Sequence, residues 1–300
     1  MTFVRCSIDE RYVNPLFEVF DGGDFILSSY RDIEEEKTTM QIFLPEASDA
    51  PRAAEALRTA GQIIGAELEI EQGEIADEDW KYAYRKHFKT DIISPRLAIV
   101  PEWEVEAFRQ SEAPTKYPGI RTIILDPGMA FGTGQHATTR ACLEYVDTLA
   151  VENTDRSFLD VGCGSGILAI AAKLEGFREV AGFDIDADAV ENANENAQKN
   201  GLGETLRFVR GDLSNTSTLP DVEKTGDRSF DVVAANVLGP ILIRFADEIA
   251  PLVAANGKLI LSGILDELYP EVKAAYEARG FVEEANHLIG EWRTGLYRKS

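Results

Sequence analysis

Residues 1–72 carry apolar positions in patterns that predict strands and helices in turn. Short runs rich in β-branched and aromatic residues mark four strands, at residues 2–8, 25–30, 38–44 and 66–72. Helical spacing marks two stretches between them, 11–20 and 48–65. In the second stretch Ser48 or Asp49 is placed to cap the helix, and Pro51 falls in its first turn. The order β-α-β-β-α-β predicts a small N-terminal α+β domain of the ferredoxin-like kind, over residues 1–72.

Residues 73–95 are expected to link this domain to the rest of the chain. The stretch 75–89 is amphipathic and charged, as is typical of a surface helix. Its basic end, around Arg85 and Lys86, could touch a ligand carboxylate, but a solvated helix face is the simpler interpretation. Two short strands are expected after it, at 95–104 and 120–128.

The pattern of a larger α/β domain follows, which we expect to span residues 96–300. Apolar runs predict strands at 157–161, 179–185, 205–211, 229–236 and 257–264. Helical stretches lie between most of them, at 167–176, 186–201 and 239–256. Apolar strands that alternate with helices indicate a parallel sheet covered on both faces. The last two runs, 281–290 and 291–300, are spaced for a hairpin, which would make the final strand antiparallel.

The charge of the chain bears on its partners. The 300 residues carry a net charge of −22, and residues 1–75 hold sixteen acids against six bases. Such a surface repels a phosphate backbone, so we expect no direct binding of nucleic acid. A basic protein would be attracted, although acidity that only keeps the protein soluble explains the charge as well. The small domain shows no residue pattern for chemistry, which favours recognition of a partner over a purely stabilising role.

Other features of the composition narrow the class of protein. No run approaches the length of a membrane span and the first residues lack the core of a signal peptide, so we expect a soluble, cytoplasmic protein. Three widely spaced cysteines argue against a disulfide framework, and no Cys/His spacing predicts a metal site. We expect no membrane partner, and we expect a monomer.

A glycine loop between a strand and a helix is the first candidate site. It reads Asp-Val-Gly-Cys-Gly-Ser-Gly over residues 160–166. Gly162, Gly164 and Gly166 permit a tight turn and a close approach of ligand to backbone, and the helix that follows offers free N–H groups. Ile167 occupies the position where a dinucleotide fingerprint needs its last glycine, which counts against a nicotinamide cofactor.

Acidic and amide side chains follow three of the predicted strands. Asp184 ends the second strand, where a carboxylate can accept both hydrogen bonds of a ribose diol, although a capping role would also explain it. Ile185 would then pack on an adenine face. Asp186 is placed to cap the next helix, and Asp212 could contact an adenine amino group or stabilise a turn. Asn236 ends the fourth strand, at the edge where open α/β sheets bind ligands.

These motifs resemble a known family. The glycine loop, Asp184, the run Ala-Ala-Asn-Val-Leu-Gly and the terminal hairpin are similar to the seven-stranded, Rossmann-like sheet of the class I S-adenosylmethionine-dependent methyltransferases. The loop Pro-Gly-Met-Ala-Phe-Gly-Thr-Gly-Gln-His-Ala-Thr-Thr at 127–139 resembles that of the PrmA family, which methylates ribosomal protein L11; the Trp80 region, Val-Pro-Glu-Trp-Glu at 100–104 and Ser-Gly-Ile-Leu at 262–265 are also similar. The similarity covers most of the chain, and in this family a ferredoxin-like N-terminal domain captures the substrate.

The resemblance assigns roles to individual residues. It implies that Thr139, Gly162, Asp184 and Asn236 contact S-adenosylmethionine, with Gly164 and Ile185 beside them. The loop at 126–140 would fold over the cofactor as a lid. Its hydroxyl groups and its apolar ring are those of Thr133, Thr138, Thr139 and Phe131. His136 could accept a proton, but a structural role is the favoured interpretation, because methyl transfer to an amine needs no strong base in the transition state.

The expected reaction is transfer of methyl groups to lysine ε-amines of ribosomal protein L11, and possibly to an N-terminal α-amine. The amine must be neutral; with a pKa near 10.4, deprotonating a free lysine at pH 7.4 costs about 4 kcal/mol. A desolvated pocket lowers that cost, and Asn236 is the candidate catalytic residue because it can accept a hydrogen bond from the amine. Methyltransferases of this fold that act on amides or bases typically carry Asn-Pro-Pro-Tyr or a similar run where this chain has Asn-Val-Leu-Gly, so an amine substrate fits better.

Two alternatives stay open. One is another protein substrate, such as an electron-transfer flavoprotein subunit, and the other is a module that binds S-adenosylmethionine or a nucleotide without catalysis.

Overall fold

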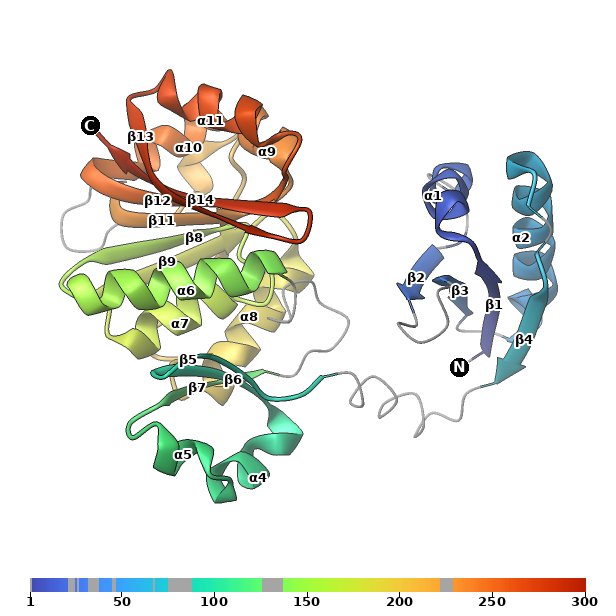
Figure 1. Ribbon diagram of the computed structural model, residues 1–300, viewed down its shortest axis with the longest axis horizontal. Coiled ribbons are helices and arrows are strands. Elements are labelled where there is room, and N and C mark those ends of the chain that lie inside the picture. Colours follow the sequence, from blue (N-terminus) through green and yellow to red (C-terminus); the bar gives the residue numbers. More distant parts are fainter. Residues whose placement is uncertain are drawn as a thin grey trace. The chain divides into compact units, whose positions relative to one another are not determined.

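The computed structural model describes nine parts of the chain, which are residues 2–20, 25, 27–31, 38–44, 47–66, 68–74, 88–125, 137–221 and 229–300. The chain divides into two compact units, Met1–His87 and Phe88–Ser300 (Figure 1). The linker helix expected at 75–89 and the Trp80 region lie almost wholly outside the described residues. None of the described helices is long and apolar enough to cross a membrane.

The described residues of the N-terminal unit form two α-helices, two short 3-10 helices and one sheet. Its elements in chain order are β1 (Thr2–Ile8), η1 (Glu10–Tyr12), α1 (Val13–Phe20), β2 (Leu27–Arg31), β3 (Thr38–Leu44), η2 (Ala47–Asp49), α2 (Ala50–Ile64) and β4 (Ile70–Glu74). The strands lie in the order β2-β3-β1-β4, and every neighbouring pair is antiparallel. This is the arrangement of a ferredoxin-like domain, as the sequence predicts.

One face of this sheet carries the core of the unit. Val4, Cys6 and Ile8 of β1 are buried, and β3 contributes buried side chains in register, with Val4 opposite Ile42. Both helices pack on that face. Small side chains of α2, such as Ala53, are fully buried and let the helix approach the sheet closely. The alternation of the strands therefore decides which face the helices cover.

The ends of α2 explain two differences from the expected elements. Asp49 is the N-cap residue, but its side chain makes no capping hydrogen bond and instead lies 3.3 Å from the guanidinium of Arg52. At the other end Gly65 adopts a left-handed conformation, with φ of 71°, and the N–H of Ala66 bonds to the carbonyl of Gly61. This turn uses the residues expected to begin the last strand, so that strand starts later, at Ile70.

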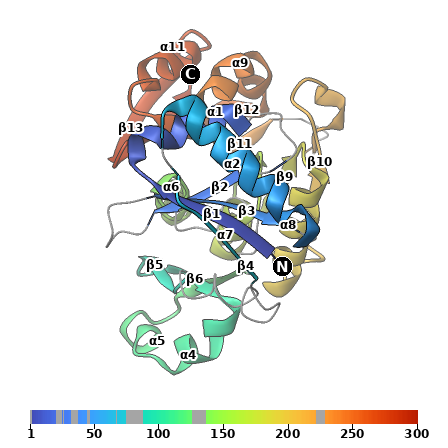
Figure 2. The ribbon, with the colours of Figure 1, turned by 90° about the vertical axis from the view of Figure 1, so that its right-hand side faces the viewer.

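The C-terminal unit holds two sheets. A three-stranded sheet is formed by β5 (Asp91–Ser94), β6 (Leu97–Pro101) and β7 (Arg121–Leu125), with η4 (Glu102–Glu104), α4 (Val105–Gln110) and α5 (Ala113–Lys116) between β6 and β7. Figure 2 shows α4 and α5 on one side of this sheet. Phe108 of α4 packs there against Ala98 and Val100 of β6, while the opposite face joins the main core of the unit.

The large sheet contains seven strands in the order β10-β9-β8-β11-β12-β14-β13. Its strands are β8 (Ser157–Val161), β9 (Glu179–Asp184), β10 (Phe208–Arg210), β11 (Phe230–Asn236), β12 (Val253–Leu265), β13 (Phe281–Ile289) and β14 (Trp292–Lys299). Among them β14 runs antiparallel to both of its neighbours, and the other pairs are parallel. The predicted hairpin and antiparallel final strand are thus confirmed.

Helices cover both faces of the large sheet (Figure 1). On one face lie α6 (Ala137–Glu152), α7 (Ile167–Glu175) and α8 (Ala187–Lys199). On the other lie α9 (Gly239–Arg244), α10 (Ala246–Ile249), η6 (Ala250–Leu252) and α11 (Tyr269–Glu277). Phe158 of β8 packs with the first group and Leu159 with the second, so the near-continuous apolar strands are buried on both faces.

The helix expected over residues 239–256 is wrong in extent. It is divided into α9, α10 and η6, and Val253 already belongs to β12. Pro251 lies at the start of η6, and a proline lacks the N–H that a continuing helix needs. The β-branched Val253 is fully buried and pairs with Phe230, so sheet packing decides the state of this segment.

An ionic cluster around the buried carboxylate of Glu175 fastens the small sheet to the helices of the large one. The carboxylate of Glu175, on α7, contacts the guanidinium groups of Arg96 and Arg121, the latter at 3.3 Å. Arg96 also bonds to Asp147 of α6 at 3.0 Å. In addition, Asn200 exchanges two hydrogen bonds with the backbone of Ile124 on β7, at 2.7 and 2.8 Å. These contacts fix β7, the strand that leads into the loop at 126–136.

Candidate cofactor and active site

Three predicted site residues lie at one edge of the large sheet because of strand register. Val161 of β8 pairs with Ala235 of β11 on one side and with Phe183 of β9 on the other. The next residue in each strand or loop is a predicted site residue: Asn236, Gly162 and Asp184. The strands are parallel, so all three lie at the carboxyl edge, where ligands bind in such sheets.

The loop between β8 and α7 needs glycine at its three glycine positions. Gly162, Gly164 and Gly166 have φ of 67°, 52° and 78°, a region that side chains disfavour. Space is also limited, because a Cβ atom on Gly162 would come within 2.6 Å of Val237. On Gly166 it would come within 2.6 Å of Phe208. At these glycines the loop backbone carries no side chain and lies close to the neighbouring strands.

Two backbone hydrogen bonds, one of them from this loop, orient the Asp184 carboxylate. The N–H of Gly164 donates to Oδ2 of Asp184 at 2.9 Å, and the N–H of Asp186 donates to Oδ1 at 3.1 Å. The N–H of Cys163 donates to the carbonyl of Phe183 at 3.0 Å, which holds the loop beside β9. A carboxylate can accept about four hydrogen bonds, and Asp184 is half-buried. Its position is thus fixed while acceptor sites stay open to a ligand.

Ile185 after Asp184 is exposed, whereas Asp186 and Asp212 hold backbone groups of the protein. Ile185 is 61% exposed, although it is large and apolar. Asp186 caps α8 by accepting the N–H of Asp188 at 3.0 Å, as predicted. The carboxylate of Asp212 accepts the N–H of Ser214 at 2.8 Å, so of the two interpretations of this residue the structure shows the turn.

Asp160 is a buried acid that the sequence interpretation left without a role. It lies in β8, is 1% exposed, and accepts the N–H of Ala169 in α7 at 3.1 Å. Burial raises the pKa of its carboxyl to about 8, the hydrogen bond from Ala169 lowers it, and the charge of Asp184 raises it. The available signal was an aspartate inside an otherwise apolar strand, which predicts a partnered buried group.

Asn236 is joined to the first turn of α6. Its Nδ2 donates to the hydroxyl oxygen of Thr139 at 3.3 Å, and Thr139 is only 2% exposed. An amide with its nitrogen engaged in this way presents its oxygen as the acceptor. No described residue donates to that oxygen, which leaves it as an acceptor at the carboxyl edge of the sheet.

A second polar contact, from β12 of the large sheet, holds the same turn of α6. The hydroxyl of Ser262, on β12, donates to the carbonyl of Thr138 at 3.3 Å and lies 2.6 Å from the hydroxyl of Thr294 on β14. Ser262 and Thr294 are both almost completely buried. Sequence reasoning missed these two residues, because a serine and a threonine in separate strands carry no motif.

The turn after Asn236 holds two large apolar side chains at the surface. Val237 is packed against the glycine loop and against Gly263, where a Cβ atom would come within 2.5 Å of the Val237 carbonyl oxygen. The turn is therefore locked in place. Leu238 is 60% exposed and Ile241, one helical turn later, is 39% exposed. With Ile185 beyond the glycine loop, exposed apolar groups lie on either side of the polar site residues.

The structure thus brings together Gly162, Gly164, Asp184 and Asn236, with Thr139 buried behind Asn236. Phe131, Thr133 and His136 lie outside the described residues, and so does most of the lid predicted at 126–140. Its last four residues, 137–140, form the first turn of α6. The site combines a bare backbone loop, an oriented carboxylate and exposed apolar side chains. These features fit a nucleoside with a ribose diol and a polar tail.

Comparisons with known proteins agree on one family. Residues 18–300 match the family model described as "Ribosomal protein L11 methyltransferase (PrmA)". A ribosomal protein L11 methyltransferase of Geobacter sulfurreducens is 46% identical over 75% of this chain and 67% of its own length, and one of an Exiguobacterium species is 36% identical over 84% of this chain and 74% of its own. A solved structure of the ribosomal protein L11 methylase of Lactobacillus delbrueckii subsp. bulgaricus has a TM-score of 0.60 at 30% identity, covering 71% of this chain and all of that one. The resemblance found in the motifs is confirmed, and the chain belongs to the family of ribosomal protein L11 methyltransferases.

Proposed function

We propose that this protein transfers methyl groups from S-adenosylmethionine to lysine ε-amines of ribosomal protein L11, and to an N-terminal α-amine where one is presented. The observation that carries the proposal is the level alignment of Gly162, Asp184 and Asn236 at the carboxyl edge of the large sheet. The names of the relatives supply the substrate, since those proteins are described as acting on ribosomal protein L11.

The residues present suit S-adenosylmethionine, which supplies an activated methyl group on a sulfonium centre. Asp184 would hold the ribose diol with the acceptor sites that its two backbone hydrogen bonds leave free. Ile185 would pack on the adenine ring, and the loop at Gly162 and Gly164 would lie against the rest of the molecule. Phe131, Thr133 and Thr139 stay proposed contacts of the cofactor.

The substrate amine would meet Asn236 and an apolar surface. The Asn236 oxygen accepts an N–H of the amine and so aims its lone pair at the methyl group. Leu238 and Ile241, held exposed by the locked turn, would cover the aliphatic stem of the lysine. Their contact excludes water from the ammonium group, which lowers its pKa and reduces the cost of about 4 kcal/mol for deprotonating a free lysine at pH 7.4.

We assign the two parts of the chain separate tasks. Residues 1–72 would recognise the substrate protein, residues 73–95 would link the parts, and residues 96–300 would carry out the transfer. The acidic surface of the first part suits a basic ribosomal protein and opposes nucleic acid. We further propose that the protein works as a monomer in the cytoplasm.

One experiment separates this function from its alternatives. The protein is incubated with radiolabelled S-adenosylmethionine, purified ribosomal protein L11 and, in parallel, a total extract of soluble proteins. Label on lysines of ribosomal protein L11 is the expected result. Label only on another protein, for example an electron-transfer flavoprotein subunit, would identify that protein as the substrate. Tight binding of S-adenosylmethionine without any label would indicate a module that binds the cofactor without catalysis.

A further inference from the structure

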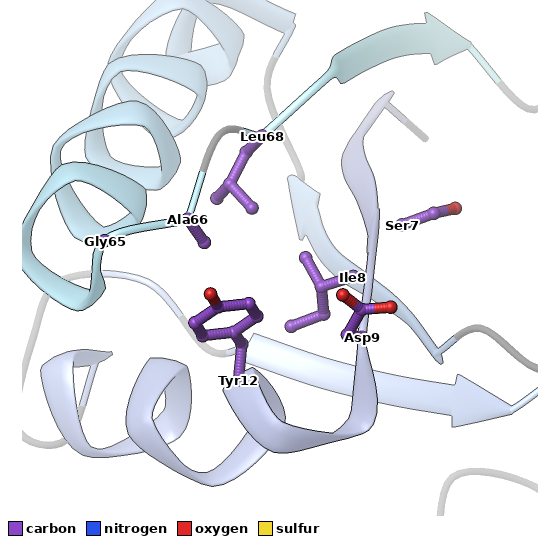
Figure 3. Close-up of a pocket in the computed structure, with 7 residues that line it drawn as sticks. All are labelled: Ser7, Ile8, Asp9, Tyr12, Gly65, Ala66 and Leu68. Carbon is purple, nitrogen blue, oxygen red and sulfur yellow. The ribbon is translucent and has the colours of Figure 1, made fainter.

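The N-terminal unit contains a pocket of about 260 Å³ at the end of β1. It lies where η1 follows β1 and where the turn after α2 leads toward β4. Figure 3 shows the side chains of Ile8, Tyr12 and Leu68 turned toward one another at this point. Ser7 and Asp9 add polar groups to the lining. The lining is therefore mainly polar, and it combines the Asp9 carboxylate and the Tyr12 ring with the apolar side chains of Ile8 and Leu68.

The walls of this pocket are held by backbone contacts. The N–H of Tyr12 bonds to the carbonyl of Asp9 at 3.0 Å, which closes the turn that carries both side chains. Across the pocket, the N–H of Ala66 bonds to the carbonyl of Gly61 at 2.8 Å. Leu68 packs directly over Gly61, where a Cβ atom would come within 2.7 Å of it. The pocket is thus formed before any ligand binds.

The chain itself shows which chemical group suits Asp9 and Tyr12. The guanidinium of Arg11 lies 4.8 Å from the centroid of the Tyr12 ring, within the range of a cation–π contact. Its Nη2 is 3.6 Å from Oδ2 of Asp9, which is an ion pair but longer than a hydrogen bond. The Arg11 side chain is 73% exposed. An exposed pair of this kind contributes little to stability, so Arg11 can leave at small cost.

We propose that this pocket binds a lysine or arginine side chain of the protein substrate, in exchange with Arg11. The methylene groups of such a side chain would pack on Ile8 and Leu68, and its cationic head would meet Asp9 and the Tyr12 ring. The proposal rests on the proposed function for the identity of the substrate. It gives the acidic N-terminal domain, with sixteen acids against six bases in residues 1–75, a defined point of contact.

The chemistry of the pocket argues against an anionic ligand. The carboxylate of Asp9 accepts no hydrogen bond from the described residues and would face the ligand directly, which repels phosphate or carboxylate groups. Attraction of a cation to Asp9 is weakened by salt, because both groups are near the surface. Binding of the substrate protein should therefore weaken as the salt concentration rises.

The test uses the full-length protein and ribosomal protein L11, with Kd measured by calorimetry and kcat and KM measured separately. Asp9→Asn and Tyr12→Leu are expected to weaken binding about threefold to tenfold and to raise KM while kcat is unchanged, as expected for loss of an ion pair or a cation–π contact. Arg11→Ala is expected to tighten binding about twofold, because it frees the site. Glu55→Gln is the matched control, since Glu55 is an exposed acid on α2, 71% exposed, and its loss changes the charge equally.

Two outcomes would overturn the proposal. One is an equal affinity of Asp9→Asn and Glu55→Gln for ribosomal protein L11, which would mean that only the net charge of the domain affects binding. The other is a loss of affinity in Arg11→Ala as large as that in Asp9→Asn, which would make the internal pair itself the determinant. Equal melting temperatures of the four variants exclude misfolding.

A second measurement separates this proposal from the proposed function. N-acetylargininamide and N-acetyllysinamide are titrated into the isotope-labelled full-length protein, and amide shifts are recorded at Ser7, Ala66 and Leu68. Shifts that Asp9→Asn removes support the pocket even where ribosomal protein L11 is not methylated. If neither compound causes shifts, the proposal that this pocket binds a cationic side chain is wrong, even where methylation succeeds. The stronger of the two compounds identifies the side chain.

Discussion

The side-chain nitrogen of Asn236 lies 3.3 Å from the hydroxyl oxygen of Thr139, which joins the end of β11 to the first turn of α6. Thr139 was expected to contact the cofactor, yet its side chain is buried and engaged with the candidate catalytic residue. The contact decides which end of the Asn236 amide faces a ligand. It also places the first turn of α6, which follows residues 126–136 in the chain, in direct contact with the site.

Removing this contact should lower the methylation rate. In Thr139→Val the hydroxyl acceptor is lost while the shape is nearly kept, so the Asn236 amide is free to rotate and kcat should fall about tenfold. Thr139→Ser retains the acceptor and should keep most of the rate. Single-turnover kinetics with saturating S-adenosylmethionine measure the effect. Similar rates in both variants would show that the hydrogen bond does not orient Asn236.

Loss of the Asp184 charge should weaken cofactor binding. Asp184→Asn removes part of the acceptor capacity proposed for the ribose diol, and the Kd for S-adenosylmethionine should rise about tenfold or more, as for a hydrogen bond to a charged group. Asp186→Asn is the control, because asparagine also caps helices well and the charge change is the same. Calorimetry measures both affinities. An unchanged Kd in Asp184→Asn would remove the assignment to ribose.

The glycine loop should tolerate no side chain at its first position. Gly162→Ala combines a positive φ of 67° with a contact of 2.6 Å to Val237, so it should destabilise the fold by about 2–3 kcal/mol and weaken cofactor binding. Gly119→Ala has a similar φ of 80° but open space around it, and should cost only about 1 kcal/mol. Urea denaturation measures both values. Equal losses would mean that the contact with Val237 relaxes freely.

The apolar surface beside Asn236 should control the protonation of the substrate amine. In Leu238→Ser water can reach the ammonium group, so its pKa in the complex rises and the pH at which kcat is half-maximal should move upward. Val151→Ser is the matched control, because Val151 is 65% exposed at the last turn of α6. A pH profile of kcat with ribosomal protein L11 measures the shift. Identical profiles for both variants would exclude desolvation by Leu238.

Asp160 should make stability depend on pH. Burial raises the pKa of its carboxyl to about 8 in the folded protein, against about 3.9 in an unfolded chain. The folded state then binds more protons between these values, so the free energy of unfolding contributed by this group decreases as pH rises from about 4 to about 8. Asp160→Asn removes that dependence and should gain stability relative to the wild type as pH rises.

Urea denaturation at pH 5.5 and pH 8 provides the comparison for Asp160. Burial also raises the pKa of Glu175, but that residue is present in both proteins, so the difference between them isolates Asp160. A constant difference in stability across this range would show that Asp160 is ionised throughout, through its bond to the N–H of Ala169.

Much of the site could be predicted because its residues come directly after strands. Asp184 and Asn236 were identifiable as ends of apolar runs, and the parallel order of the strands then aligns them without further information. The glycine loop was visible for the same reason. In each case one short segment contains both the strand and the polar residue, so the local sequence carries the signal.

The rest depends on contacts between distant segments. Ser262 and Thr294 are 32 residues apart and meet only because β14 enters the sheet beside β12. Two strands of the small sheet, β6 and β7, were expected, but β5 was not. The attachment of this sheet to the helices of the large one depends on Glu175, which binds arginines 54 and 79 residues away. The helix after Asn236 was overextended because burial of Val253 in the sheet overrides local helical spacing.

The position of β14 has a consequence for how the protein is made. This strand follows β13 in the chain, yet it lies between β12 and β13 in the sheet. The outer edge of β12 therefore has no partner strand until β14 has been synthesised. A nascent chain that has emerged only as far as β13 has no hydroxyl from Thr294 to support Ser262, and therefore an unsupported first turn of α6. During translation, the enzyme should gain its activity in one late step and not by degrees.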